Sequence, residues 1–361
     1  MPAAFPAAPP VLAQTDIRLS FKLPILATIL TRTWTARGPL ACALWPLSML
    51  FGGLSWVRRL MYRHGLLASV RLPVPVIIVG NIFIGGTGKT PLTIWLVQSL
   101  REAGRVPGVI SRGHGGSQAA PRSVHLDSLP GDVGDEPLLI AQRARCPVVV
   151  GHGRVDAARL LLAANPEVDV IVSDDGLQHY ALQRDIEIIL FDARRVGNGW
   201  LLPAGPLREP ASRRRDFTVV NIDPMTEGVP RGALTMRLGG THAEALANRS
   251  KSMPLEMFAV SAPRIVAAAG IGNPARFFAM LRTFGLMFAE VPLPDHYDFG
   301  INPFAALDAE VILITEKDAV KCSRIDMIRH DPRLWVVPVT AQIDAALATN
   351  IVEKLRGHPT A

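Results

Sequence analysis

The feature that most constrains the fold is a glycine-rich loop between an apolar strand-like run and a helical pattern. The run Val74–Val79 is β-branched and nearly wholly apolar, as expected for a central parallel strand covered on both faces. It leads into GNIFIGGTGKTP, residues 80–91, and a helical pattern follows over Leu92–Leu100. Strand, glycine loop and helix in this order are typical of a phosphate-binding P-loop.

The loop carries the groups that a nucleotide and its metal need. Glycines let backbone N–H groups close around a phosphate, Lys89 can reach the β- and γ-oxygens, and Thr90 can offer a hydroxyl to Mg²⁺. The strict motif has Gly where this chain has Phe83, so the loop is a variant, and a chance glycine-rich turn is the alternative. Its position between strand and helix favours nucleotide binding. The residues predicted to bind ATP are Gly85, Gly86, Thr87, Gly88, Lys89, Thr90 and Pro91.

A second acidic motif follows another apolar run, Val168–Ser173. Asp174 and Asp175 come directly after it and should lie at the carboxyl end of the same sheet, where open α/β sheets bind ligands. We predict that they hold Mg²⁺; a turn that only ends the strand is the alternative.

Phosphoryl transfer to an alcohol also needs a proton acceptor, and GDEP supplies a candidate in Asp135. From the residues alone, a general base and a helix N-cap are equally good interpretations of this position. Arg154 and Arg208 lie in Gly- and Pro-framed loops and could bind phosphate oxygens, although each alone could equally be structural.

Near the N-terminus, residues 38–57 contain no charge, and Arg58 and Arg59 follow. The length permits a membrane span, but Pro39, Pro46 and a Gly-Gly pair favour a helix lying in the membrane surface. A buried core helix is the alternative. A hydrophobic fraction of 49% and a net charge of +7 agree with contact with an anionic membrane. No nucleic-acid-binding motif is recognisable, so we expect no nucleic acid partner, and no obligate protein partner is inferred.

The spacing of strand-like runs predicts the architecture, an α/β fold with a doubly wound, mostly parallel P-loop NTPase sheet and a second, smaller α/β domain. Short strand-like pieces are expected at 235–238 and 257–260. The chain is expected to divide into five parts: an extension and basic lead-in (1–37), a membrane-associated helix (38–63), the P-loop domain (64–225), a linking ribbon (226–262) and the smaller domain (263–361).

Several motifs occur together and in order: GN-x-x-x-GGTGKTP, SRG-x-G, GDEP, DDGLQH, LLPAGPLRE, AGIGNP-x-x-F, PDHY-x-F and TEKDAVK. In this combination the chain resembles the tetraacyldisaccharide 4'-kinases, the lipid A kinases of Gram-negative bacteria, from about Leu40 to Val337. The resemblance implies transfer of the ATP γ-phosphate to the 4'-hydroxyl of an acylated disaccharide 1-phosphate, at the cytoplasmic face of the inner membrane.

The resemblance also implies residue roles. Asp135 would be the general base, assisted by His296. Glu209 would join Thr90, Asp174 and Asp175 at the metal, and Arg154 and Arg208 would stabilise charge. Gln178, His179 and Lys317 match family motifs without an assigned step. Because Asp135 and His296 fall in different predicted domains, we expect a closure that brings them together.

Two other functions remain open on the sequence. One is a membrane-surface P-loop ATPase that switches conformation, although the extra lysine of the partitioning-type ATPases is replaced by Ile84. The other is a P-loop kinase that acts on a different small-molecule hydroxyl.

Overall fold

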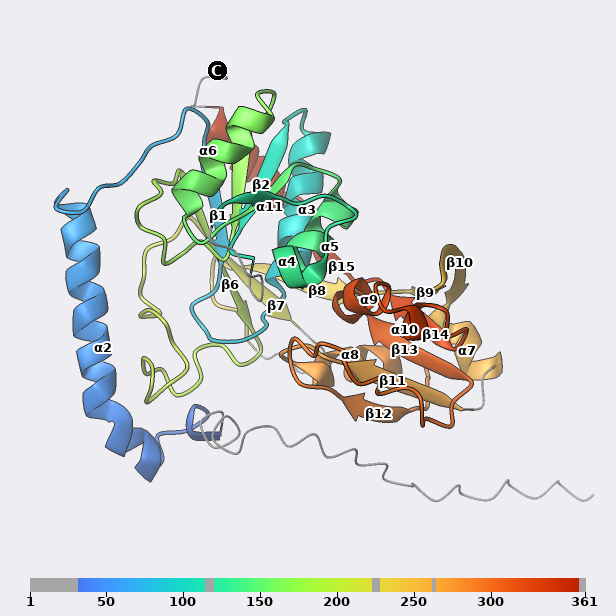
Figure 1. The fold of residues 1–361 in the computed structure, drawn as a ribbon. Helices are drawn as coiled ribbons and strands as arrows, with labels where there is room; N and C mark the ends of the chain where they lie inside the picture. Colours follow the sequence, from blue (N-terminus) through green and yellow to red (C-terminus); the bar gives the residue numbers. More distant parts are fainter. Residues whose placement is uncertain (1–31, 114–119, 223–227, 262–263, 357–361) are drawn as a thin grey trace, which may run out of the picture.

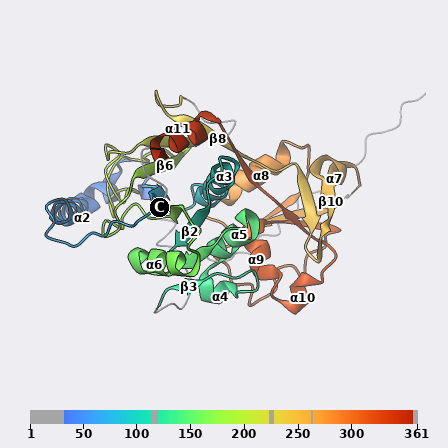
Figure 2. The same ribbon diagram turned by 90° about the horizontal axis from the view of Figure 1, so that it is seen from above.

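The chain forms two α/β units and a separate long helix, α2 (Figure 1). The structure is a computed structural model, which describes residues 32–113, 120–222, 228–261 and 264–356. Most of the predicted lead-in, residues 1–37, lies outside the described residues. Seen from above, α2 and the second unit lie at opposite ends, with the first unit between them (Figure 2).

The first unit is built on a nine-stranded, mostly parallel sheet. In spatial order its strands are β15 (Thr340–Ile343), β8 (Leu234–Gly239), β7 (Phe217–Ile222), β6 (Ile186–Asp192), β1 (Val76–Gly80), β5 (Val170–Asp174), β2 (Pro107–Ser111), β4 (Val148–Val150) and β3 (Arg122–Ser123). Only the two edge strands, β15 and β3, are antiparallel to their neighbours. The predicted doubly wound fold is confirmed.

Both faces of this sheet are covered because successive side chains of a strand point to opposite sides. In β1, Ile77 and Val79 face one core, and Val76 and Ile78 face the other. The first core is closed by α3 (Lys89–Glu102), α5 (Asp135–Ala144) and α11 (Ala346–Leu355), and the second by α6 (Arg154–Ala164). A short helix, α4 (Pro130–Val133), precedes α5.

The second unit repeats this three-layer plan on a smaller sheet. Its strands, in order, are β10 (Asn248–Pro254), β9 (His242–Ala245), β14 (Leu334–Val337), β13 (Val311–Thr315), β11 (Ile265–Ala269) and β12 (Ala289–Pro292). Helices α7 (Leu255–Ser261) and α8 (Pro274–Arg282) pack on one face, and α9 (Glu316–Cys322) and α10 (Asp326–Arg329) on the other.

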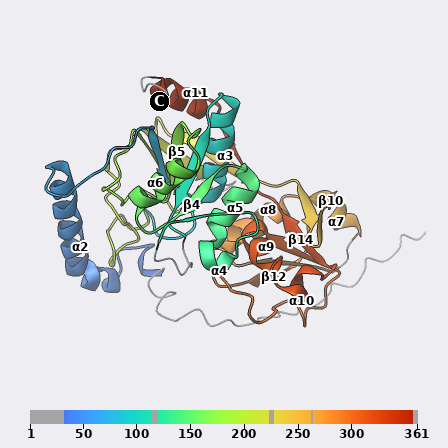
Figure 3. The ribbon, with the colours of Figure 1, turned by 45° about the horizontal axis from the view of Figure 1, so that its top comes forward.

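Two expectations differ from the structure. The strand-like piece expected at 257–260 lies in helix α7, where Leu255 and Phe258 are buried one turn apart. The predicted boundaries also do not follow the sheets, because β8 pairs with β7 in the first sheet and β15 and α11 return to it from the C-terminus. Figure 3 shows α11 beside α3.

Helix α2 (Pro39–Arg63) presents most of its apolar side chains to solvent. Leu50 is 60% and Leu54 is 64% exposed, whereas a helix of a soluble core would bury such residues. The helix is long and apolar enough to cross a membrane by length and composition, with a mean hydropathy of 1.6. It contacts the first unit at few points, among them the hydrogen bond from Ser48 Oγ to the Leu201 carbonyl, 2.8 Å long.

Candidate active site

Contacts of Phe83 and Asn81 stabilise the variant P-loop, in which Phe83 stands where the strict motif has glycine. Phe83 is buried in the second core and stacks under the guanidinium of Arg194, 4.4 Å from the ring centre. Asn81 is fully buried and donates to the carbonyls of Phe83 and Gly85. Gly88 has φ of +98°, where a side chain would be strained and would meet Asn221. The loop therefore keeps the turn of a P-loop, and the buried side chain of Phe83 fixes it to the second core of the first unit.

The P-loop and the second acidic motif meet at the carboxyl end of the sheet, as predicted. Strand β1 pairs with β5 so that Val79 lies opposite Asp174. Lys89 Nζ donates to Asn81 Oδ1 at 3.1 Å and lies 3.6 Å from Asp175 Oδ1. Arg208 Nη1 is 3.2 Å from Asp175 Oδ2, so two cations flank this carboxylate.

The two neighbouring aspartates have different electrostatic environments. Asp174 is buried, and its carboxylate accepts hydrogen bonds from Thr93 and Ser111. Burial, aided by nearby carboxylates, raises the pKa of Asp174 to about 7. Burial also acts on Asp175, but Lys89 and Arg208 outweigh it and lower the pKa of Asp175. Asp175 is thus the more readily ionised of the two carboxyl groups.

Arg154, the first residue of α6, contacts the carboxyl end of strand β5. Only 2% of it is exposed, and its guanidinium donates to the carbonyl of Gly151 at 2.7 Å and to that of Asp174 at 3.4 Å. Burial lowers the pKa of Arg154 to about 10. These contacts hold the end of β5 in place.

Glu209 lies in a different set of contacts from the P-loop groups. Its carboxylate accepts hydrogen bonds from Gln178, Tyr180 and Arg213, and Arg59 of α2 approaches to 3.6 Å. These interactions connect α2 to the loop after β5. They do not bring Glu209 to Lys89 or Asp175, and its predicted place at the metal stays a prediction.

Asp135 and His296, expected in separate domains, are already in contact. Asp135 begins α5, and His296 Nδ1 lies 3.1 Å from its Oδ2. His296 has φ of +60°, an uncommon conformation for a residue with a side chain, which its neighbours must hold in place. The expected closure is therefore not needed to form this pair, because the two units already pack together through α5 and α9.

Two lysines, Lys317 and Lys321, lie close to the pair. Burial acts against ionisation of Asp135, but the hydrogen bond from His296 and the charges of Lys317 and Lys321 outweigh it, so the pKa of Asp135 lies far below its usual range. The hydrogen bond to Asp135 in turn raises the pKa of His296. Lys321 was not among the predicted residues, although its spacing of four from Lys317 on a helix was a signal.

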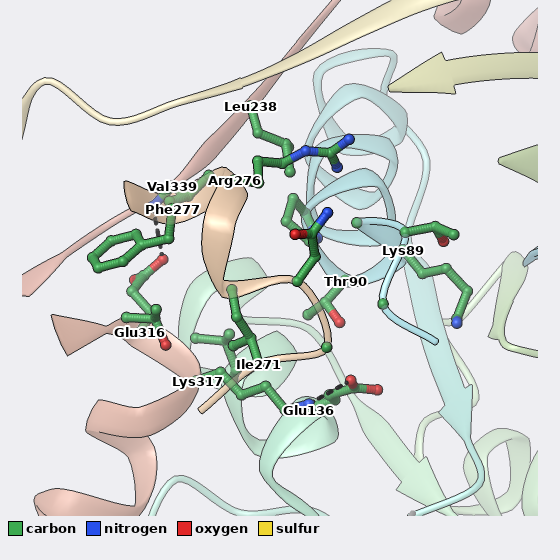
Figure 4. Close-up of a pocket in the computed structure, with 18 of the residues that line it drawn as sticks. Lys89, Thr90, Glu136, Leu238, Ile271, Arg276, Phe277, Glu316, Lys317 and Val339 are labelled. Atoms are coloured by element: carbon green, nitrogen blue, oxygen red, sulfur yellow. Dashed lines mark hydrogen bonds and ion pairs between the residues drawn. The ribbon is translucent and has the colours of Figure 1, made fainter. Parts of the chain in front are cut away.

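A pocket opens between the two units beside the P-loop (Figure 4). Lys89 and Thr90 line one side, while Ile271 and Phe277 of the second unit line another. Glu136, next to the catalytic candidate Asp135, also lines it. The units also pack closely at Gly272, where an added Cβ would lie only 2.8 Å from the backbone nitrogen of Gly86.

A doubly wound sheet with a P-loop, an acidic motif at the same edge and a carboxylate–imidazole pair next to the loop defines a P-loop phosphotransferase. The family model described as tetraacyldisaccharide-1-P 4'-kinase matches residues 40–356. The chain belongs to this family.

Individual relatives agree with the assignment. The tetraacyldisaccharide 4'-kinase of Janthinobacterium sp. (strain Marseille) is 63% identical over 340 residues, which cover 93% of this chain and 98% of the relative. That of Herminiimonas arsenicoxydans is 60% identical, with coverage of 95% and 99%. Among solved structures, the "apo" form of LpxK from Aquifex aeolicus in complex with ATP has a TM-score of 0.73 and 27% identity, and covers 88% of this chain and 99% of the other.

Proposed function

We propose that this chain transfers the γ-phosphate of ATP to the 4'-hydroxyl of tetraacyldisaccharide 1-phosphate, giving the bis-phosphorylated precursor of lipid A. Membership of the tetraacyldisaccharide-1-P 4'-kinase family supports the reaction and the acceptor. The solved relative with ATP supports the donor.

The observation that carries a kinase, rather than a conformational ATPase switch, is the Asp135–His296 pair. It lies next to Glu136, which lines the same pocket as the P-loop residues Lys89 and Thr90. Phosphoryl transfer to an alcohol needs a group near the transferred phosphate that can accept the proton of the acceptor hydroxyl. We propose that Asp135 accepts this proton and that His296 assists it.

The roles of the remaining groups follow from their positions. Lys89 binds phosphate oxygens, Arg208 beside Asp175 neutralises charge that develops on the transferred group, and Arg154 keeps the end of β5 in position. Since Arg154 donates to backbone carbonyls and is buried, we propose that it acts through structure rather than by touching the phosphate.

The donor set at the strand ends suits Mg²⁺, which prefers oxygen ligands and keeps several waters and phosphate oxygens. Thr90 and the ionised Asp175 would hold it, with Asp174 behind them. Among the described residues no cluster of three or more His, Cys, Asp or Glu side chains is arranged to hold a metal ion. A bound metal would therefore depend on the nucleotide phosphates, whose charge it would neutralise.

We further propose that α2 holds the enzyme at the cytoplasmic face of the inner membrane, as a peripheral or monotopic protein. The exposed apolar side chains of α2 and the arginines at its C-terminal end fit a membrane interface. The ion pair of Arg59 with Glu209 would then bring the segment between β6 and β7 next to the lipid surface.

The test is transfer of label from γ-labelled ATP to tetraacyldisaccharide 1-phosphate in detergent micelles with Mg²⁺. We expect labelled lipid from the wild type, none above background from Lys89→Met, and wild-type rates from Lys354→Met, a partly exposed lysine on α11. Hydrolysis of ATP without labelled lipid would favour the ATPase switch. Label on a soluble sugar but not on the lipid would favour another acceptor.

A further inference from the structure

Helix α9 carries two lysines, Lys317 and Lys321, whose spacing of four places both on one face. This face lies against the start of α5, where Asp135 and Glu136 are found. The side chains of both lysines are largely buried, with 14% and 15% exposed. Buried ammonium groups need partners, and each lysine bonds to the Asp135–His296 pair directly.

Lys321 contacts the carboxylate. Its Nζ lies 2.9 Å from Asp135 Oδ2 and donates to the carbonyl of Tyr297, the residue after His296, at 3.0 Å. One ammonium group thus joins α5 of the first unit to the loop of the second unit that carries His296. Asp135 Oδ1 is occupied by the N–H of Glu136 at 2.9 Å, so the orientation of the carboxylate is fixed on both sides.

Lys317 contacts the imidazole. Its Nζ is 3.3 Å from His296 Nε2, and it is held by Glu136 at 3.2 Å and Asp295 at 3.1 Å. Figure 4 shows Lys317 pointing towards Glu136 at the edge of the pocket. An ammonium group can only donate, so Nε2 must accept and the proton of the neutral ring must be on Nδ1, where it is donated to Asp135.

We propose that Lys317 and Lys321 are positioning residues of the transfer reaction: Lys321 fixes the Asp135 carboxylate, and Lys317 keeps Nε2 of His296 unprotonated, so that the ring stays neutral with its proton on Nδ1. The proposal rests on the proposed function for the role of the pair, and on the contacts above for the arrangement itself.

Electrostatics agree with this geometry. Burial opposes the charge of Lys317, but Glu136, Asp135 and Asp295 outweigh burial and raise its pKa, so Lys317 stays cationic at neutral pH. Both lysines lower the pKa of Asp135, and Lys317 opposes protonation of His296. The charged groups that face the pair are these two lysines from α9, Glu136 from α5 and Asp295 from the loop of His296.

The first arm of the test does not depend on lipid transfer. The full chain, labelled with ¹⁵N-histidine in detergent micelles, is titrated by NMR, and the His296 signals are assigned with His296→Gln. In the wild type, at pH values above the pKa of His296, we expect a protonated Nδ1 and an unprotonated Nε2. In Lys317→Met the pKa of the ring should rise, because a neighbouring cation has been removed, while Nδ1 stays protonated opposite the ionised Asp135 carboxylate. Lys317→Arg should partly restore the wild-type signals.

The second arm measures kcat and the KM for ATP against pH. Because general acid–base groups contribute about 10²–10⁴-fold, we expect each methionine variant to lower kcat by about tenfold or more without changing the KM. Lys321→Arg, which keeps the charge and can still donate to Asp135, should recover most of the kcat that Lys321→Met loses, and Lys354→Met should keep the whole wild-type profile.

Unchanged His296 signals in Lys317→Met, or a kcat of Lys321→Met that equals the wild-type value or is not recovered in Lys321→Arg, would overturn the proposal. If a methionine variant does not fold, glutamine at the same position gives the same comparison. A wild type that shows the expected His296 signals but labels no lipid would refute the proposed function and leave the arrangement of the pair standing.

Discussion

Replacing Gly272 with Ala tests whether the packed arrangement of the two units is the one that binds nucleotide. The new Cβ would lie 2.8 Å from Gly86 N and 3.2 Å from an Asp295 carboxylate oxygen. The first neighbour is P-loop backbone, which cannot rotate away, so the units must separate by several tenths of an ångström. Overpacking of this kind costs about 1–3 kcal/mol. The equilibrium constant for packing of the second unit on the P-loop would therefore fall by roughly 5- to 150-fold.

The assay is steady-state lipid phosphorylation with ATP varied. We expect kcat/KM for ATP to fall by a factor within that range. Gly131→Ala, at a position in α4 with no atom within 4 Å of the new Cβ, is the matched control and should behave as wild type. An unchanged or higher kcat/KM in Gly272→Ala would refute the reasoning, because the contact would then be absent or inhibitory in the working enzyme.

Three further outcomes are expected. Asp135→Asn should lower the free energy of unfolding in urea; since the folded pKa of Asp135 lies below its usual value of 3.8, this difference should be full above about pH 4 and shrink as the pH falls. Replacing Leu50 and Leu54 with Ser should reduce sedimentation with anionic vesicles by about tenfold or more, because burial of each leucine contributes about 1.5–3 kcal/mol; equal binding would contradict a membrane role. Arg213→Met leaves the buried carboxylate of Glu209 poorly paired and should cost about 3–5 kcal/mol in urea unfolding, and an unshifted midpoint would argue against the ion pair.

The first sheet was predictable because its strands carry a strong local signal. Val76–Gly80 and its neighbours are buried on both faces, which requires continuous β-branched runs. The piece at 257–260 was assigned wrongly because a short apolar run fits both a strand and a buried helix turn. Nothing local in Met257–Val260 indicates that Phe258 packs edge-on against Trp335.

Some contacts of the site could likewise be predicted from the sequence, and others could not. Lys89 and Asp175 follow strands that lie side by side, so the sequence order was enough to bring them together. The contact of Asp135 with His296 spans 161 positions and was available only through the family resemblance. The spacing of four placed Lys321 on the same helix face as Lys317, but its ion pair with Asp135 depends on how α9 packs against α5, which the sequence pattern does not specify.

The return of β15 and α11 to the first sheet has a consequence for synthesis in the cell. Leu347, Ile351 and Leu355 of α11 fill the core that α3 also closes. A nascent chain that has already exposed its P-loop and second unit still lacks this cover until α11 has left the ribosome. The nucleotide-binding unit therefore completes its folding only after α11 has been made, and a nonsense mutation before Leu347 acts as a deletion in the core of the first unit.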